Sequence, residues 1–157
     1  PTENVIVRGC TMKDGHGGVT MGSEISGGCR NVFVENCWMN STNLDRVLRF
    51  KSNAVRGGVV ENIFVRDVRV GSVRDAVLQI DFLYEEGTNG VHRPVVRNVV
   101  IERLDVQRAQ RVLDIRGYRG AEIRGVRIHD SVFRGISRDD SVTEGDVKLV
   151  NCRILRE

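Results

Sequence analysis

Arg49 and Lys51 stand two residues apart in the run VLRFKS (47–52). Side chains at alternate positions of a β-strand point to the same face, so a strand here would set both cations side by side. A guanidinium binds a carboxylate through two parallel hydrogen bonds, and an ammonium acts as a point charge. The pair therefore predicts a site for a carboxylate, such as that of an acidic sugar.

The same cations could instead belong to a network of ion pairs. The similar run VLQIDF (77–82) carries Asp81, and VLDIRG (112–117) carries Asp114 and Arg116. Pairing of Lys51 with Asp81, and of Arg116 with either carboxylate, would neutralise these charges within the protein. The residues by themselves favour this network over a ligand site.

A histidine between two glycines, Gly15-His16-Gly17, comes directly before another such run, GVTMGS (18–23). The flanking glycines allow a bend that would present the imidazole at the entrance of the strand. His16 could orient an acid or bind a hydroxyl there, or it could have no special role. The motif alone does not decide between these interpretations.

The longest stretch between the repeated runs is FLYEEGTNGVHRP (82–94), which contains Tyr84, Glu85, Glu86, His92 and Arg93. A long loop on a repetitive fold often borders a binding groove, and a solvated loop is the simpler alternative. His129 is interpreted as structural or exposed. No group of residues has the spacing of metal ligands, so neither a metal nor another cofactor is expected.

The elements that must position these residues follow from an internal repeat. A nine-residue pattern recurs six times, with starts 21 to 36 residues apart. Apolar residues occupy its second, fourth, seventh and ninth positions, which predicts two short strands with a bend between them. The first position holds Asn, Gly or Asp, which tolerate a left-handed backbone, so one such turn is expected in each repeat. The segments are NVIVRGCTM (4–12), NVFVENCWM (31–39), NIFVRDVRV (62–70), NVVIERLDV (98–106), GVRIHDSVF (125–133) and DVKLVNCRI (146–154).

The seventh position of this pattern predicts a column of inward side chains. Three of the four cysteines fall there, which explains them as small core residues. The cysteines form no Cys-x-x-Cys pair, so a zinc site is not expected. A disulfide between Cys10 and Cys37 of neighbouring repeats remains an alternative. The seventh positions are Cys10, Cys37, Val68, Leu104, Ser131 and Cys152.

A third strand is predicted after each of the first four segments, within 18–23, 47–52, 77–82 and 112–117. Its inward positions are apolar, and its outward positions align from repeat to repeat in two columns. The first column is Thr20, Arg49, Gln79 and Asp114; the second is Gly22, Lys51, Asp81 and Arg116.

Short stacked strands with a step of about 28 residues predict an all-β fold, a right-handed single-stranded parallel β-helix (a solenoid) of about five to six coils. A solenoid with an uncapped end exposes its apolar cross-section and unpaired strand edges. The first repeat begins at residue 4, with no capping segment before it. We therefore expect residues 1–157 to be a single domain, the C-terminal part of a larger solenoid whose N-terminal coils and cap are missing.

The composition excludes several classes of protein. Hydrophobic residues make up 40% of the 157 and charged residues 29%, which is typical of a soluble globular domain and not of a disordered chain. No apolar stretch is long enough for a transmembrane helix. The aromatic content of 5% and the net charge of +3 argue against a nucleic-acid-binding surface. Arginine far outnumbers lysine, which suits carboxylate recognition or reflects genomic base composition.

Several of these runs together resemble glycoside hydrolase family 28, the polygalacturonases. The resemblance rests on Gly15-His16-Gly17, GVTMGSEISGGCRNV (18–32), RVLRFKSN (46–53) and RGGVVENIFVRDV (56–68), in the family's order. It extends over at least residues 4 to 106, and the run GSEISGG (22–28) is most similar to exo-acting polygalacturonases of bacterial type. The family's fold is a right-handed parallel β-helix, which agrees with the repeat pattern.

The resemblance implies roles for individual residues. His16 would be catalytic, by supporting the catalytic constellation. Arg49 and Lys51, with Phe50 where the motif has Ile, would bind the galacturonate carboxylate at the point of cleavage. Ser23 and Glu24, in the GSEISGG run, would also bind substrate. The family's Asn-Thr-Asp and Asp-Asp motifs, which supply acid and base, should precede Gly-His-Gly and are not found in this sequence.

The function that the resemblance implies is hydrolysis of α-1,4-galacturonosyl linkages of pectin or polygalacturonate with inversion, in an exo-acting enzyme. The chain would supply the carboxylate-binding part and be inactive by itself. The expected partner is an acidic polysaccharide, with neither nucleic acid nor membrane, in a secreted or periplasmic location.

Two alternatives accompany this expectation. The first is a non-catalytic β-helix that binds an acidic polysaccharide through the same residues. The second is a pectate-lyase-like enzyme, which would need a calcium site built from clustered carboxylates. The outward columns supply mainly Asp81 and Asp114, mixed with arginine, so the lyase is the weaker of the two.

Overall fold

The computed structural model describes all 157 residues and consists of strands and connecting loops, without a helix. Nine strands form one sheet and five form a second. No segment therefore forms a helix that could cross a membrane. In chain order the strands are β1 (Thr2–Arg8), β2 (Thr11–Met12), β3 (Val19–Met21), β4 (Cys29–Met39), β5 (Arg46–Lys51), β6 (Val59–Ser72), β7 (Ala76–Asp81), β8 (Val95–Arg108), β9 (Arg111–Arg116), β10 (Ile123–His129), β11 (Val132–Ile136), β12 (Ser141–Thr143), β13 (Gly145–Val150) and β14 (Arg153–Arg156).

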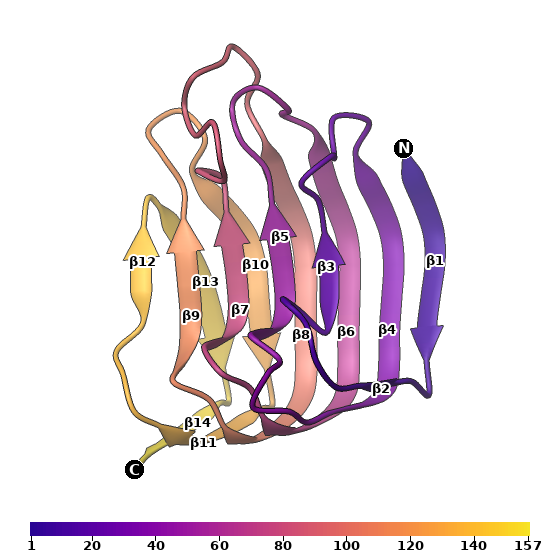
Figure 1. Cartoon of the computed structure of the whole chain (residues 1–157), viewed down its shortest axis with the longest axis vertical. Coiled ribbons are helices and arrows are strands. Elements are labelled where there is room, and N and C mark those ends of the chain that lie inside the picture. The colour runs from indigo at the N-terminus through magenta and orange to yellow at the C-terminus, as the bar shows by residue number, and fades with distance from the viewer.

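The chain winds as a parallel β-helix, as the repeat pattern predicts. The larger sheet follows the order β1-β4-β6-β8-β10-β13, and the smaller follows β12-β9-β7-β5-β3. All pairings between these strands are parallel, and each strand pairs with the equivalent strand of the next coil. Figure 1 shows the two sheets one behind the other, with β2, β11 and β14 joining them along one side. Each coil thus contacts only its neighbours, as in other solenoids.

The register matches the predicted alignment of the six repeats. The second position of each pattern pairs with the second position of the next, from Val5 with Val32 through Val99 with Val126. The predicted left-handed turn occurs at the first position in five repeats, with φ between 51 and 71° from Asn4 to Gly125. In the sixth repeat the positive φ falls at Glu144, two residues before Asp146, where the pairing of β10 with β13 shifts register.

The first positions also form an asparagine ladder. The side-chain amide of each of Asn31, Asn62 and Asn98 donates to the amide oxygen of the asparagine one coil earlier, at 3.1, 3.1 and 2.7 Å. The ladder satisfies polar groups at the turn and aligns the coils, since each bond spans one full repeat.

A second left-handed residue, at the sixth position, was not predicted. Asn36, Asp67 and Arg103 have φ of 53, 54 and 52° in the middle of β4, β6 and β8. Such a residue interrupts the in–out alternation of a strand, so the fourth and seventh positions both face the interior. This is the physical form of the predicted bend, and it lets one long strand line two sides of the coil.

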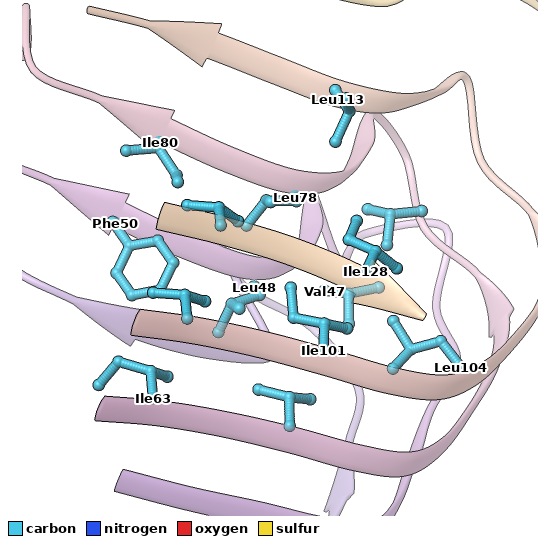
Figure 2. Packing of buried hydrophobic residues seen from close by; sticks show 14 of the residues in the cluster. Val47, Leu48, Phe50, Ile63, Leu78, Ile80, Ile101, Leu104, Leu113 and Ile128 are labelled. Atoms are coloured by element: carbon cyan, nitrogen blue, oxygen red, sulfur yellow. The ribbon is translucent and has the colours of Figure 1, made fainter. Parts of the chain in front are cut away.

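The interior is a continuous apolar core of 36 buried residues from both sheets. Figure 2 shows Leu48 and Phe50 of β5 and Leu78 and Ile80 of β7 packed opposite Ile63, Ile101 and Ile128 of the larger sheet. The predicted inward positions of the third strands are thus confirmed for these coils. They hold β5 and β7 in place, so that the outward side chains stand at fixed positions.

The cysteine column differs in part from the prediction. Cys37, Val68, Leu104 and Ser131 are buried in the middle coils, whereas Cys10 is exposed and Cys152 half-buried in the outer ones. All four cysteines are free, so the alternative of a Cys10–Cys37 disulfide is wrong.

Candidate functional site

The strand β5 carries the predicted cationic pair on its outward face. Its register sets Thr20, Arg49, Gln79 and Asp114 in one row, and Lys51, Asp81 and Arg116 in the next, as the sequence predicts. These rows are less exposed than expected, since Gln79, Asp81 and Asp114 are 1%, 6% and 3% exposed. Arg49 and Arg116 form hydrogen bonds with side chains of these rows, and the ring of Tyr84 lies over Lys51. The polar rows therefore form an ordered network in place of a solvated face.

Arg49 is held in position through one of its nitrogens. Its Nε donates to Oε1 of Gln79 at 2.8 Å, and Nε2 of Gln79 donates to Oδ2 of Asp114 at 2.7 Å. The two Nη groups of Arg49 form no hydrogen bond or ion pair within the protein. These two groups are the end of the guanidinium fork that binds a carboxylate through two parallel bonds. The Arg49 guanidinium is thus oriented and still available to an anion.

Lys51 does not form the ion pair with Asp81 that the alternative interpretation required. Asp81 instead accepts the backbone N–H of Leu83 at 2.8 Å, and lies 3.8 Å from Nη1 of Arg116. The part of the network that does form joins Arg116 to Asp114, through bonds of 3.0 Å to both carboxylate oxygens. Arg116 thereby pairs with Asp114 and also lies close to Asp81, and Lys51 is left without a carboxylate partner.

Tyr84 contacts both cations of β5. The Nζ of Lys51 lies 4.8 Å from the centre of the Tyr84 ring, and Cζ of Arg49 lies 5.8 Å from it. A cation over an aromatic face is stabilised by the ring quadrupole, without the neutralisation that a carboxylate brings. The sequence placed Tyr84 in a loop that could border a groove. Nothing in the sequence around Tyr84 indicates that its ring lies over Arg49 and Lys51.

The loop that carries Tyr84 is anchored to the coil before it. The side-chain amide of Asn53, which is fully buried, donates to the Tyr84 carbonyl oxygen at 2.8 Å and to Oε2 of Glu86 at 2.7 Å. Arg56 lies 3.6 Å from the Glu85 carboxylate. His92, in the same loop, lies against Gly57 and takes no part in the contacts with Arg49 or Lys51. These contacts fix the tyrosine over β5.

The electrostatics of the pair favour a bound anion. Burial, together with the nearby Arg46, lowers the pKa of Arg49 below its ordinary value. Burial, and then the charge of Arg49, lowers the pKa of Lys51 below its ordinary 10.5. Both shifts mean that the charged forms are destabilised in the free protein. A carboxylate bound beside them would stabilise both charged forms through its opposite charge.

The Gly15-His16-Gly17 loop lies beside Arg49. Gly15 forms two backbone hydrogen bonds with the segment before β5, to Asn43 at 3.0 Å and from Asp45 at 2.9 Å. A Cβ at Gly17 would lie 3.2 Å from Cβ of Arg49 and 2.4 Å from Oγ1 of Thr20, so a larger residue there would crowd both side chains. His16 itself is exposed and makes no hydrogen bond within the protein. The structure thus places His16 directly before Gly17, the residue that packs against Arg49.

Ser23 and Glu24 reach the same region from the end of β3. They line a hollow of about 470 Å³, together with Thr2, Thr20, Met21, Gly22, Ile25, Cys29 and Lys51; we call it the Lys51 hollow. Ser23 is half-buried, while the Glu24 side chain is 93% exposed and lies 3.8 Å from Arg56. Lys51 and Ser23 therefore meet in one concave surface, and Glu24 lies at its rim.

Three aspartates near the site are already engaged. Asp81 and Asp114 are held by Arg116, and Asp14 accepts a hydrogen bond from the Ser41 hydroxyl. No group of three or more His, Cys, Asp or Glu side chains is arranged to hold a metal ion. The chemistry offered by these residues is the binding and orientation of an anion.

Comparisons with known proteins agree with the fold. No protein-family model matches the chain, and no curated protein matches it. Among solved structures, the chain is similar to a hyperthermoactive exopolygalacturonase from Thermotoga maritima, with 31% sequence identity over 95% of this chain and a TM-score of 0.87. The chain spans about a third (33%) of the length of that structure. It therefore has a polygalacturonase-like parallel β-helix fold.

Proposed function

We propose that the chain belongs to a polygalacturonase-like glycoside hydrolase, and that it supplies the part of the binding cleft that holds a uronate carboxylate. The observation that carries the proposal is the pair Arg49 and Lys51, oriented on one face of β5 without a carboxylate partner. The likeness to an exopolygalacturonase supports α-1,4-linked galacturonate as the substrate class and exo action as the mode.

In this proposal each site residue has a separate task. Arg49 binds the sugar carboxylate through its two Nη groups, and Lys51 adds a point charge on the same side. Tyr84 sets the position of both cations. Ser23 and Glu24 bind hydroxyl groups of the sugar across the Lys51 hollow, and His16 supports the reacting groups at the edge next to Arg49. Held in this way, the substrate loses little further entropy on reaching the transition state.

The acid and base of the reaction are placed outside these 157 residues. Hydrolysis with inversion needs two carboxyl groups about 6.5–9.5 Å apart, one to protonate the leaving oxygen and one to activate water. Asp81 and Asp114 do not suit these roles, because both are buried and are held by hydrogen bonds to the Leu83 backbone and to Arg116, respectively. We therefore expect this chain to bind oligogalacturonate without cleaving it. That behaviour is what the alternative, a non-catalytic β-helix that binds an acidic polysaccharide, also requires.

Calorimetric titration of the chain with trigalacturonate tests the proposed binding. Replacement of Arg49 or Lys51 by Ala should weaken binding at least about tenfold, because a charge-assisted hydrogen bond contributes about 1.5–3 kcal/mol. Arg127→Ala on β10 and Lys148→Ala on β13 are matched controls. Both side chains are exposed cations that form no ion pair, and both lie on strands other than β5. Unchanged affinity in the Arg49→Ala and Lys51→Ala variants would contradict the proposal.

Release of reducing ends from polygalacturonate separates the hydrolase from the alternative. We expect none from this chain or from its His16→Ala variant, and release once coils carrying an acid and a base are supplied. Release by the chain alone that is lost in His16→Ala would place the acid and base among its own residues. Continued absence of release from the extended protein would favour the non-catalytic β-helix.

A further inference from the structure

A second concave surface lies on the larger sheet, away from β5. It has a volume of about 700 Å³, within the range of small-ligand sites, and shares no residue with the Lys51 hollow. We call it the Trp38 hollow. Its lining comes from the bends of the first four coils: Gly9, Cys10, Thr11, Asn36, Cys37, Trp38, Asp67, Arg69 and Arg103.

The centre of this hollow is an exposed aromatic side chain. Trp38 is 38% exposed, although indole is largely buried in most proteins. The register places Thr11 beside Trp38 on one side and Arg69 on the other. The residues on the Thr11 side, Gly9 and Cys10 included, are small. One side of the indole is therefore bordered by small side chains, which leaves room for a flat apolar surface such as the C–H face of a pyranose ring.

The charges around Trp38 suit an anion. The guanidinium carbon of Arg69 lies 5.5 Å from the centre of the Trp38 ring, and Arg69 forms no ion pair. Arg103, by contrast, binds Asp67 through bonds of 2.7 and 3.1 Å. The lining thus holds two cations and one anion, a net charge of +1. Because Asp67 is satisfied by Arg103, Arg69 is the group that remains available to a carboxylate.

We propose that the Trp38 hollow is a second binding site for an acidic sugar, which stacks on the indole of Trp38 and directs its carboxylate to Arg69. The class of sugar rests on the proposed function; the site itself rests on the indole and the unpaired guanidinium. The protein would then hold one polyuronate at two places, β5 and the bend of β4. Two linked sites raise the affinity for a polymer above the affinity for a short oligomer.

The chain contains its own probe of this site, because Trp38 is its single tryptophan. Titration with trigalacturonate should give a saturable change in tryptophan fluorescence. The change should persist in an Arg49→Ala/Lys51→Ala double variant, which removes the cations of β5. In Arg69→Gln the midpoint should rise about tenfold, as expected for loss of an arginine at a contact centre. Arg127→Gln, at an exposed arginine on β10, is the control and should leave the midpoint unchanged.

Polymer binding gives a second readout. Retention on immobilised polygalacturonate should fall in Trp38→Ala and be kept in Trp38→Phe, which preserves an aromatic face. Calorimetric binding of trigalacturonate without any change in Trp38 fluorescence would overturn the inference, and so would an equal response to neutral trigalactose. Loss of the fluorescence change in the Arg49→Ala/Lys51→Ala variant would also overturn it. If instead these two cations prove irrelevant to calorimetric affinity while the Trp38 response remains, the proposed function of β5 fails and the second site stands.

Discussion

The ammonium group of Lys51 lies over the ring of Tyr84, 4.8 Å from its centre, although the two residues belong to different coils. The strand register would have allowed Lys51 to pair with Asp81, its neighbour on β7. Arg116 and the Leu83 backbone take up that carboxylate instead. The aromatic ring holds the lysine without neutralising it. Lys51 thereby stays available to an anion from solution.

The contacts of Tyr84 predict different effects for two substitutions. Tyr84→Phe keeps the aromatic face and should change trigalacturonate affinity by less than about twofold. Tyr84→Ala removes it and should weaken binding about fivefold, since a partly exposed cation–π contact contributes about 1 kcal/mol. Isothermal titration calorimetry measures both. Equal affinities for Tyr84→Ala and the unchanged chain would show that the ring does not position the cations.

The lowered pKa of Lys51 predicts a pH dependence of binding. The charged form of Lys51 exists below its pKa, so affinity for a uronate should be full at neutral pH and fall as the pH rises through a value below the ordinary 10.5. Lys51→Arg should retain affinity over that alkaline range, because an arginine side chain keeps its proton there. Titrations between neutral pH and about pH 10.5 provide the comparison. A decline of the same size in Lys51→Arg would assign the pH dependence to another group.

Gly22 predicts a stability effect next to the site. Its φ is +100°, and a Cβ there would lie 2.0 Å from the carbonyl oxygen of Lys51. Gly22→Ala should lower the free energy of unfolding by about 3 kcal/mol, from overpacking and backbone strain together. Gly87 also has a positive φ, +58°, but its nearest atom lies at 3.7 Å. Gly87→Ala should therefore cost only about 1 kcal/mol.

Urea unfolding compares the two glycine variants directly. If they have the same midpoint and slope, the close approach of Gly22 to the β5 backbone contributes nothing to stability.

The asparagine ladder predicts which of two further variants is the more stable. Asn62 has a φ of 56° and takes part in two ladder bonds, with Asn31 and Asn98. Asn62→Gly allows the same backbone conformation without steric strain but loses both side-chain hydrogen bonds. It should lower the free energy of unfolding by about 1–2 kcal/mol. Asn62→Ala loses the bonds and strains the turn, and should be destabilised by about 1 kcal/mol more. Chemical denaturation measures both, and a more stable Asn62→Ala would contradict this account.

The repeat pattern was sufficient to predict the fold and the two outward rows. Alternation of apolar and polar residues sets which side chains of a strand face inward, as at Leu48 and Phe50, and this property is local. Stacking of identical positions then aligns Arg49 with Gln79 and Lys51 with Asp81, because every coil repeats the same geometry. The asparagines at the first position showed where the backbone turns. The sixth position carries the same kind of signal, because five of its six residues are Gly, Asn or Asp and only Arg103 is not a type that favours a left-handed turn.

The sequence by itself thus determined the β-helix, its register, and the presence of Arg49 and Lys51 on one face. Only the tertiary structure decided which charges remain free. The pairing of Arg116 with Asp114, the burial of Gln79, and the placement of Tyr84 over Lys51 each depend on competition between side chains of different coils. The outcome depends on distances between side chains that are about thirty residues apart in the sequence, and on the conformations of the loops. A local sequence pattern contains no information on either. The same reason applies to Trp38, whose position beside an unpaired Arg69 follows from stacking and from the partners that the other arginines found.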